Sequence, residues 1–352
     1  LDRPGRVVAC ALWRPMGRVL ASQRITWPQM TVAVLVLPLH YVLCRICVDR
    51  FGPLGAGVAT SCSGWVQLLG LTICVRIAGR GQTIWGGQGG AVALKQAGAG
   101  WRTLAKLAYP SAAMRVLENW GFSGMVVASS LLPAATTETD VMSISLNLYA
   151  TLFMIFPALS IATDTRVGRA VGAGATHDAR RAFYVSAAIS VPFALMCSLV
   201  TLLPGPRAIV EQILHVEELR PEVKDGLWSV FRIFGVFYYL DGAQTVLSGA
   251  IRGLGEQKNG AWICVVAYWV FGIPTAIVLA FPVGLAATGL WLGMTVGPSV
   301  QLLLYIRLLL RVDWQAAVSK CEARLNGGAA TEAAQPSSGR GRTELQECEG
   351  AA

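Results

Sequence analysis

Apolar runs of about 20 residues alternate with short polar connectors over most of the 352-residue chain. A helix needs about 20 apolar residues to cross the hydrocarbon core of a bilayer, within a range of roughly 17 to 25. By this measure the pattern predicts eight membrane-spanning helices, at 28–48, 54–75, 103–132, 139–163, 182–203, 227–251, 261–282 and 286–310. We therefore expect an all-α polytopic membrane protein.

The segments outside these helices are polar or rich in glycine. Residues 1–27 hold too many arginines to cross a bilayer, so we interpret them as the end of a preceding helix and a loop. Residues 79–102 predict a Gly-rich cytoplasmic connector, and the composition of residues 313–352 predicts a disordered cytoplasmic tail. The chain begins with Leu1 rather than methionine, so we expect it to start inside a longer protein.

Lysine and arginine are concentrated in alternate connectors. The connectors after the second, fourth, sixth and eighth predicted helices are basic, whereas LLPAATTETD after the third and PVGLAATG after the seventh contain neither residue. Basic connectors remain on the cytosolic side of a membrane. Both ends of the chain are therefore expected in the cytosol.

The composition agrees with this pattern and excludes other classes of protein. Charged residues make up 14% of the chain and hydrophobic residues 54%, whereas a typical soluble domain carries about 25% charged residues. The mean hydropathy is +0.53. These values exclude a soluble enzyme and a disordered scaffold. The net charge of +9 lies mostly in the connectors, so it predicts membrane orientation and no binding of nucleic acid.

No pattern of catalytic or metal-binding residues stands out. The nine cysteines are scattered, and the CxxC of Cys44 and Cys47 has no second pair to complete a zinc site. The glycine-rich stretch 168–174 lacks the Gly-Lys-Ser/Thr of a phosphate loop. We predict no enzymatic activity, no cofactor and no metal, and a membrane-embedded enzyme is the weakest alternative.

Several short motifs resemble those of a known family. They are KLAYPSAAM (106–114), LENW (117–120), MSISLN (142–147), LDGAQ (240–244) and VLSGAIRG (246–253). With these motifs the chain resembles the multidrug and toxic compound extrusion (MATE) family, in its plant branch of detoxification-type carriers, over about residues 15–315.

The resemblance implies a fold of twelve helices in two six-helix lobes, around a central cavity that opens alternately to either side. The predicted helices then correspond to helices five to twelve. Residues 28–78 supply the last two helices of the N-terminal lobe, and residues 103–312 supply a complete C-terminal six-helix lobe. This match leaves out four helices of the first lobe, so a truncated MATE fragment that does not transport remains the alternative.

Two acids lie deep within predicted membrane helices, where a charged side chain costs on the order of 2.5–3.5 kcal/mol. Glu118 lies about 22 Å along its helix and Asp241 about 21 Å along its own, at 1.5 Å per residue. The two helices enter from opposite sides, so both carboxylates are expected near the middle of the membrane. Removal from water disfavours the charged form of a carboxylate, and in the resembled carriers acids at these motif positions are the proposed proton and substrate sites. The resemblance therefore assigns proton coupling to Glu118 and Asp241.

Arg115 leaves a second interpretation of Glu118 open. It stands three residues before Glu118 on the same helical face, so the two side chains can form an ion pair. The resembled family usually has a small or apolar residue at this position. An adjacent cation stabilises the ionised carboxylate, and a buried ion pair is then the alternative to a proton site.

Other side chains at similar depth are candidates for binding substrate. Asn119, Asn147 and Gln244 can hydrogen-bond a substrate or bridge helices. The aromatic rings of Trp120, Tyr239 and Tyr268 can stack on a flat or cationic guest, or can pack between helices.

The resemblance implies a secondary active transporter that exports organic compounds, such as xenobiotics or secondary metabolites, by antiport with protons. The expected partners are a small organic substrate, protons and the lipid bilayer, and the carrier is expected to be a monomer. The vacuolar and plasma membranes both remain open as its location. The plant-type resemblance favours protons over sodium ions.

Overall fold

The computed structural model describes residues 3–22, 25–77, 90–202 and 219–333, and every regular element in these ranges is helical. The chain divides into two compact units, Leu1–Arg102 and Thr103–Ala352. Each unit is described by itself.

The first unit contains α1 (Arg3–Ser22), α2 (Trp27–Phe51) and α3 (Pro53–Ile77). α3 packs against both α1 and α2. Its turn with α2 is made at Gly52, whose φ of 58° lies in the left-handed region that glycine adopts without strain. The predicted end of a preceding helix over residues 1–27 is thus helical over Arg3–Ser22.

α2 presents large apolar side chains outward. Val34, Leu35 and Leu37 are 70%, 66% and 72% exposed. A helix with such a surface is suited to contact with lipid, because soluble proteins rarely expose such a large apolar patch to water. On its other side, the Nδ1 atom of His40 lies 2.8 Å from Oγ of Ser63 on α3, so the polar imidazole is hydrogen-bonded.

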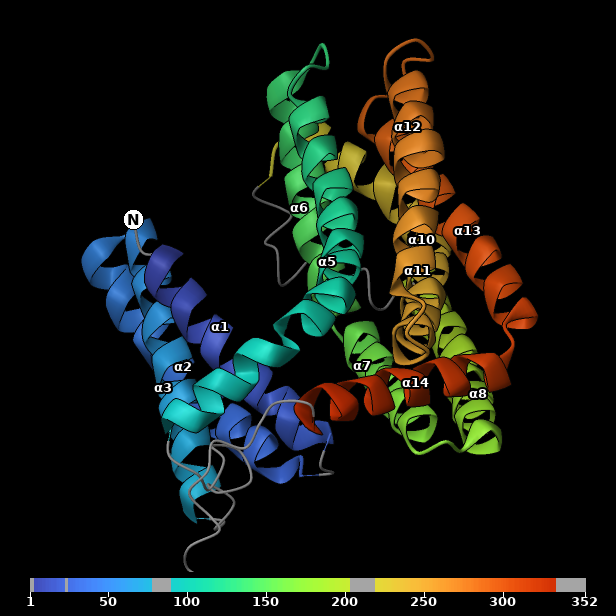
Figure 1. Cartoon of the computed structure of the whole chain (residues 1–352). Helices are drawn as coiled ribbons and strands as arrows, with labels where there is room; N and C mark the ends of the chain where they lie inside the picture. Colours follow the sequence, from blue (N-terminus) through green and yellow to red (C-terminus); the bar gives the residue numbers. More distant parts are fainter. Residues whose placement is uncertain (1–2, 23–24, 78–89, 203–218, 334–352) are drawn as a thin grey trace, which may run out of the picture. The chain divides into compact units, whose positions relative to one another are not determined.

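The second unit is a helical bundle (Figure 1). It contains α5 (Gly90–Ser129) from Thr103 onward, α6 (Ala135–Phe153), α7 (Ile155–Gly172), α8 (Thr176–Leu202), α10 (Pro221–Gly253), α11 (Gln257–Cys264), η2 (Val265–Gly272), α12 (Ile273–Ala280), α13 (Ala286–Arg311) and α14 (Trp314–Ala333).

α10 is the best buried helix of this unit and packs against α6, α7, α8 and α13. Small residues allow its closest approach, which is to α7. A Cβ atom at Gly249 would lie 2.3 Å from the carbonyl oxygen of Ser160, and one at Gly253 would lie 2.9 Å from that of Asp164. These glycines therefore set how near the two backbones come.

Two helices are interrupted next to a proline. α6 and α7 meet at Met154 with a bend of 42°, because Pro157 has no N–H to donate to the carbonyl of Phe153. The η2 segment is a π-helix between α11 and α12, and Pro274 follows it. Such irregular turns are frequent at functional sites, and both lie beside the cavity described below.

The helices agree closely with the predicted spans, with one change of shape. The predicted single span at 139–163 is the bent pair α6 and α7. Among the described residues five helices have the length and hydropathy of a membrane span, and the bent pair makes a sixth. α5 and α10, which carry the two deep acids, fall outside this group, and the count of eight remains a prediction.

Two segments predicted to be irregular are helical. Residues 90–102 belong to α5 although a connector was expected over 79–102, because AVALKQA consists mainly of good helix formers. Trp314–Ala333 forms α14 although a disordered tail was expected from residue 313. Asp313 Oδ1 accepts the backbone N–H groups of Gln315 and Ala316 at 2.9 and 3.1 Å, which caps this helix. Residues 78–89 and 334–352 lie outside the described residues.

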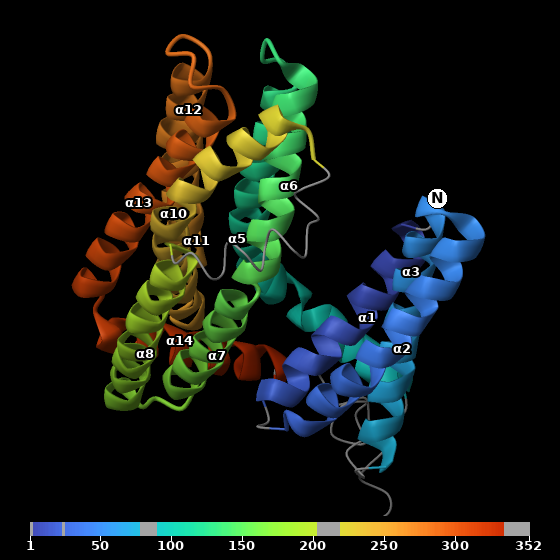
Figure 2. The same cartoon turned by 180° about the vertical axis from the view of Figure 1, so that it is seen from behind.

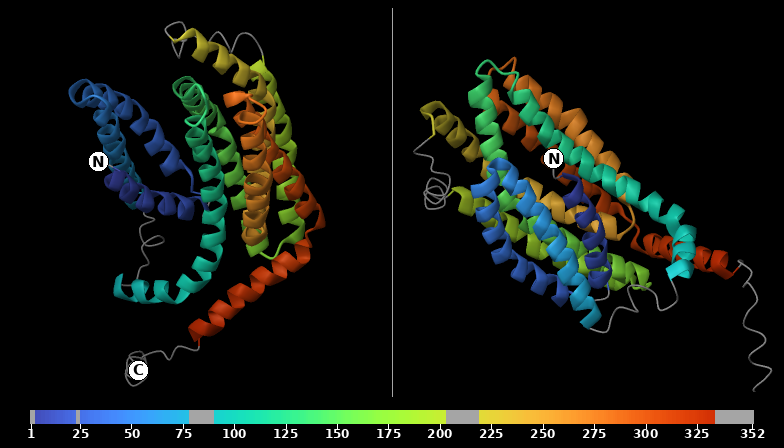
Figure 3. Two further views of the ribbon diagram at one scale, coloured as in Figure 1. Left: turned by 90° about the horizontal axis from the view of Figure 1, so that it is seen from above. Right: turned by 90° about the vertical axis from the view of Figure 1, so that its left-hand side faces the viewer.

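The connectors of the second unit gather at two opposite ends. α14 lies across one end of the bundle (Figures 1 and 3), where Lys320 bonds Glu256 at 3.0 Å and Gln315 bonds Thr176 at 2.8 Å. The connectors at 130–134 and 281–285 lie at the other end (Figure 2). Within this unit, the basic connectors after the fourth, sixth and eighth predicted helices therefore share one end, and the two connectors without lysine or arginine share the other.

Candidate functional site

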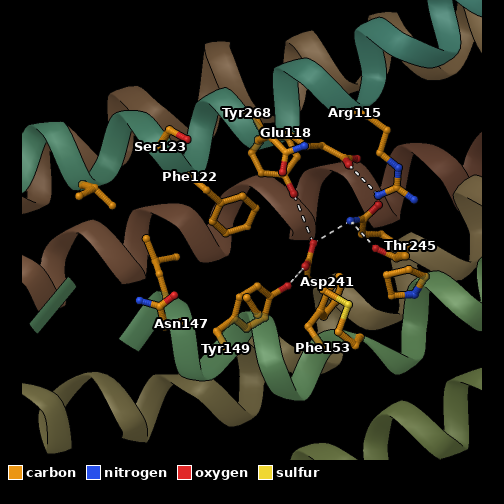
Figure 4. A pocket seen from close by; sticks show the side chains of 17 residues that line it. Arg115, Glu118, Phe122, Ser123, Asn147, Tyr149, Phe153, Asp241, Thr245 and Tyr268 are labelled. Carbon is orange, nitrogen blue, oxygen red and sulfur yellow. Dashed lines mark hydrogen bonds and ion pairs between the residues drawn. The ribbon is translucent and has the colours of Figure 1, made fainter. Parts of the chain in front are cut away.

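A cavity of about 410 Å³ lies inside the second unit, between α5, α6, the start of α7, α10 and η2 (Figure 4). Its wall combines charged and amide side chains with aromatic rings. The charged, amide and hydroxyl residues are Arg115, Glu118, Asn119, Ser123, Asn147, Asp241, Gln244 and Thr245, and the aromatic residues are Phe122, Tyr149, Phe153 and Tyr268.

Asp241 lies on α10 and is only 3% exposed. Its Oδ2 accepts a hydrogen bond from the hydroxyl of Tyr149 on α6. Its Oδ1 accepts one from Nε2 of Gln244 at 2.7 Å and one from the hydroxyl of Tyr268 on η2 at 3.3 Å. Three donors thus replace water around the carboxylate, while no cation among the described residues lies within ion-pair distance.

Glu118 lies on α5 with its side chain 13% exposed. Its Oε2 lies 3.4 Å from Nη1 of Arg115, which confirms the ion-pair partner that the spacing predicts. Its Oε1 accepts a hydrogen bond from Nε2 of Gln301 on α13 at 3.1 Å. The Arg115 side chain is 43% exposed, so solvent screens this pair and its attraction is modest.

The two predicted proton-coupling residues therefore meet at one cavity, although they are 123 positions apart in the sequence (241 minus 118). They differ in charge compensation. Glu118 has a guanidinium beside it, whereas Asp241 is held by neutral donors. The two carboxylates thus face the same space in different electrostatic surroundings.

Aromatic rings form the wall beside Asp241. The ring of Phe122 stacks on that of Tyr149 with centroids 5.8 Å apart, and Phe153 lies 4.9 Å from the same tyrosine. The ring of Tyr268 lies 6.4 Å from that of Phe122. Such a wall accepts flat apolar groups and favours cations over ring faces.

The predicted substrate-binding residues divide into two groups. Asn119, Asn147, Gln244 and Tyr268 line the cavity, and Nδ2 of Asn147 also donates to the carbonyl of Ser143 at 2.9 Å.

Trp120 and Tyr239 do not line this cavity. Trp120 is 62% exposed, and Tyr239 packs against the hydrophobic core. Each lies two residues from one of the acids, which turns its side chain to another face of the helix.

Sequence reasoning missed Tyr149 and Gln301, although both reach an acid from a distant helix. Gln301 is a lone amide within the apolar run 286–310, which is a detectable signal of a polar contact. Tyr149 gives no such signal, because a tyrosine in an apolar helix is ordinary. Among the described residues no group of three or more His, Cys, Asp or Glu side chains is placed to hold a metal ion.

Comparison with known proteins gives a consistent result. The MatE family model matches residues 110–278, which include both acids. Protein DETOXIFICATION 13 of Arabidopsis thaliana is 31% identical to this chain, and the match covers 91% of the chain and 67% of the relative. The chain belongs to the MATE family.

Other MATE proteins agree with this assignment. Protein DETOXIFICATION 14 of Arabidopsis thaliana is 32% identical over 90% of the chain and 64% of its own length. The crystal structure of the eukaryotic MATE transporter AtDTX14 matches with a TM-score of 0.78 at 30% identity, over 87% of this chain and 66% of that chain. An outward-facing multidrug resistance MATE family transporter has a TM-score of 0.67 at 17% identity, which shows the common fold.

This MATE protein therefore belongs to a family of membrane transporters, and its apolar helices are those of an integral membrane protein. The sequence spans 64% and 65% of the lengths of two curated relatives, Protein DETOXIFICATION 14 and Protein DETOXIFICATION 17.

Proposed function

We propose that this MATE protein exports organic compounds across its membrane in exchange for protons. The observation that carries the proposal is Asp241, a buried carboxylate on the wall of a cavity, held by three neutral donors. A carboxyl group in such surroundings can exist in either protonation state, because neither state leaves an unpaired charge beside it.

Competition between a proton and a substrate provides the coupling. The ionised carboxylate attracts a cationic substrate into a cavity of low dielectric, where the attraction is stronger than in water. Protonation removes that charge and releases the substrate. Exchange follows when the cavity opens to one side in one protonation state and to the other side in the other state.

Glu118 contributes to the same exchange with less weight than Asp241. Arg115 lies 3.4 Å from its carboxylate and offsets part of the charge that a cation would feel. We therefore assign the larger role in proton coupling to Asp241.

The wall of the cavity favours flat aromatic compounds, such as xenobiotics or secondary metabolites. Phe122, Tyr149 and Phe153 offer ring faces, and Asn119 and Asn147 offer amide groups for hydrogen bonds. The resistance to several drugs that is stated for one structural relative agrees with such a permissive surface.

We further propose that the protein acts as a monomer in the vacuolar or plasma membrane, with both ends in the cytosol. The alternation of basic and uncharged connectors supports the orientation.

Reconstitution into liposomes tests the function. A pH gradient with an acidic liposome interior is expected to drive uptake of a fluorescent aromatic cation, and Asp241→Asn is expected to abolish this flux. Glu118→Gln is expected to reduce it. Asp140→Asn is the matched control, because Asp140 is an exposed acid that pairs with Arg220 outside the cavity.

Flux that is unchanged in Asp241→Asn contradicts the assignment of the proton site. Flux that follows a sodium gradient and ignores the pH gradient contradicts proton coupling.

A further inference from the structure

Each acid of the cavity is paired with a buried glutamine. Gln244 on α10 is 1% exposed and donates from Nε2 to Asp241 at 2.7 Å. Gln301 on α13 is 0% exposed and donates from Nε2 to Glu118 at 3.1 Å. The same amide group thus stands beside both carboxylates, although the two glutamines come from different helices.

Both amides also contact a hydroxyl group through the same nitrogen. Nε2 of Gln244 lies 3.2 Å from Oγ1 of Thr245, and Nε2 of Gln301 lies 2.8 Å from the hydroxyl oxygen of Tyr305. A hydroxyl group can donate or accept a hydrogen bond. It can therefore bind either end of an amide.

The opposite end of each amide has no such partner. Oε1 of Gln244 and Oε1 of Gln301 are buried without a hydrogen-bond partner among the described residues. A buried acceptor without a partner is unfavourable and rare in folded proteins. The surroundings of each amide are thus one-sided, with every partner at the nitrogen end.

The protonation state of the acid decides whether the nitrogen or the oxygen of the amide can hydrogen-bond to the carboxyl group. An ionised carboxylate only accepts hydrogen bonds, so the amide must present its N–H groups. A protonated carboxyl group keeps one oxygen that accepts hydrogen bonds. When its O–H faces the amide, however, that O–H needs an acceptor, and an amide nitrogen has no free lone pair to accept it. An amide turned by about half a rotation accepts that O–H at Oε1 and accepts the neighbouring hydroxyl as well.

We propose that Gln244 and Gln301 are positioning residues whose side-chain amides reverse when Asp241 and Glu118 take up a proton. This proposal rests on the proposed function of the two acids as proton sites. The reversal gives each carboxyl group a hydrogen-bond partner in both states. It also preserves the contact between α5 and α13 that Gln301 makes with Glu118.

Other titratable and charged groups also lie near the two acids. Asp241 faces Tyr149 on α6 and Tyr268 on η2. Glu118 faces Arg115 on its own helix. The charged and titratable groups close enough to interact with it from neighbouring helices are Tyr149, Asp241, Arg252, Cys264, Tyr268 and Tyr305. None of these side chains is an amide, so the reversal has its own spectroscopic signature.

Infrared difference spectroscopy of the full chain in liposomes tests the proposal, with the glutamine side-chain carbonyls labelled with ¹³C. At neutral pH the bands of Gln244 and Gln301 are expected at the high frequency of carbonyls without hydrogen bonds. Acidification is expected to move them to lower frequency as Oε1 gains hydrogen bonds. Gln244→Leu is expected to remove the Gln244 band, and Gln301→Leu is expected to remove the Gln301 band. In Asp241→Asn the Gln244 band is expected to stop responding to pH, and in Glu118→Gln the Gln301 band is expected to stop responding.

Gln257 on α11 is the matched control. Its Nε2 donates to the carbonyl oxygen of Arg252 at 3.1 Å, and its Oε1 is also buried without a partner among the described residues. It has no carboxyl partner among these residues, so acidification is expected to leave its band unchanged. A Gln244 or Gln301 band that is immobile, or that already has the hydrogen-bonded frequency at neutral pH, overturns the proposal.

Transport kinetics separate a reversing amide from a fixed donor. A fixed donor stabilises only the ionised acid, so its loss in Gln244→Leu would raise the pH of half-maximal transport by about one to two units. A reversing amide stabilises both states. We therefore expect Gln244→Leu to move that pH little, and a large movement overturns the proposal.

The two proposals fail in distinguishable ways. The amide bands report protonation of the acids and do not depend on substrate movement. Bands that respond to pH in a protein without proton-driven flux contradict the antiport and support the reversal. Proton-driven flux with immobile bands contradicts the reversal and supports the antiport.

Discussion

The carboxyl group of Asp241 receives hydrogen bonds from α6, α10 and η2. A hydrogen bond to a charged group contributes about 1.5–3 kcal/mol, so each donor has a measurable influence on the balance between the ionised and protonated forms. Under the proposed antiport, the residues that tune the balance therefore include Tyr149 and Tyr268, whose hydroxyls donate to Asp241.

Tyr149→Phe is expected to raise the pH of half-maximal transport by about one to two units. The hydroxyl of Tyr149 donates to Asp241, and its loss disfavours the ionised form, so the proton is retained up to a higher pH. The pH profile of proton-driven uptake in liposomes measures this change.

Tyr238→Phe is the control for that experiment. Tyr238 lies on α10 as Asp241 does, but its hydroxyl donates to the carbonyl oxygen of Leu152 at 2.6 Å. Its pH profile is expected to match the unmodified protein, and an equal shift in both variants would contradict the role of Tyr149.

Arg115→Leu is expected to increase the apparent affinity for a cationic substrate by up to about fivefold. The guanidinium is half exposed, and its interaction with a nearby charge is therefore worth about 0.2–1 kcal/mol. Displacement of a fluorescent cation from the purified protein measures the affinity.

Arg220→Leu removes a cation from an exposed pair with Asp140 and leaves the cavity intact. No change in affinity is expected for this variant. A loss of affinity in Arg115→Leu would show that the guanidinium binds the substrate rather than repels it.

At the scale of whole helices, the contact between α7 and α10 depends on the close approach of their two backbones. Arg252 Nη2 donates to Oγ of Ser160 at 2.8 Å across the contact, and Gly249 faces the carbonyl oxygen of the same serine. Backbone atoms cannot retreat as a flexible side chain can, so an added methyl group must separate the helices.

Gly249→Ala is expected to lower the free energy of unfolding by about 1–3 kcal/mol, because the new Cβ would lie 2.3 Å from that carbonyl oxygen. Thermal unfolding in detergent measures the effect as a lower melting temperature.

Gly124→Ala is the matched substitution on α5, where a Cβ meets no atom within 4 Å. Alanine is preferred to glycine inside a helix by about 0.5–1 kcal/mol, so this variant is expected to raise the melting temperature. Equal effects of the two substitutions would contradict the close packing of α7 and α10.

The second unit as a whole has two chemically different ends. One end contains α14 and the basic connectors, and the other contains the connectors at 130–134 and 281–285 (Figure 1). The positive-inside rule places the first end in the cytosol.

Single cysteines in a variant without the nine native cysteines test this orientation. A membrane-impermeant maleimide is expected to label His177→Cys from the cytosolic side, and Leu131→Cys and Val283→Cys from the opposite side. His177 is 89% exposed in its side chain, and Leu131 and Val283 are 72% and 56% exposed. Labelling of all three positions from one side would contradict the predicted topology.

The sequence alone determined the class of protein, the positions of the long helices and the two acids. Hydropathy and helix length are local properties, so runs such as 54–75 and 286–310 identify α3 and α13 without knowledge of their neighbours. The predicted depth of Glu118 and Asp241 rests on the same local count. The prediction was wrong at α14, because the polar composition of this segment predicted disorder although its residues form a helix capped by Asp313.

The tertiary structure decided which side chains surround those acids. Tyr149 reaches Asp241 across 92 positions, and Gln301 reaches Glu118 across 183. Such contacts depend on how helices rotate and approach each other. Small residues at the α7–α10 contact, the bend between α6 and α7 and the π-helix η2 all affect this arrangement. Because rotation about a helix axis decides whether a side chain faces the cavity, Gln244 lines it while Tyr239 packs into the core.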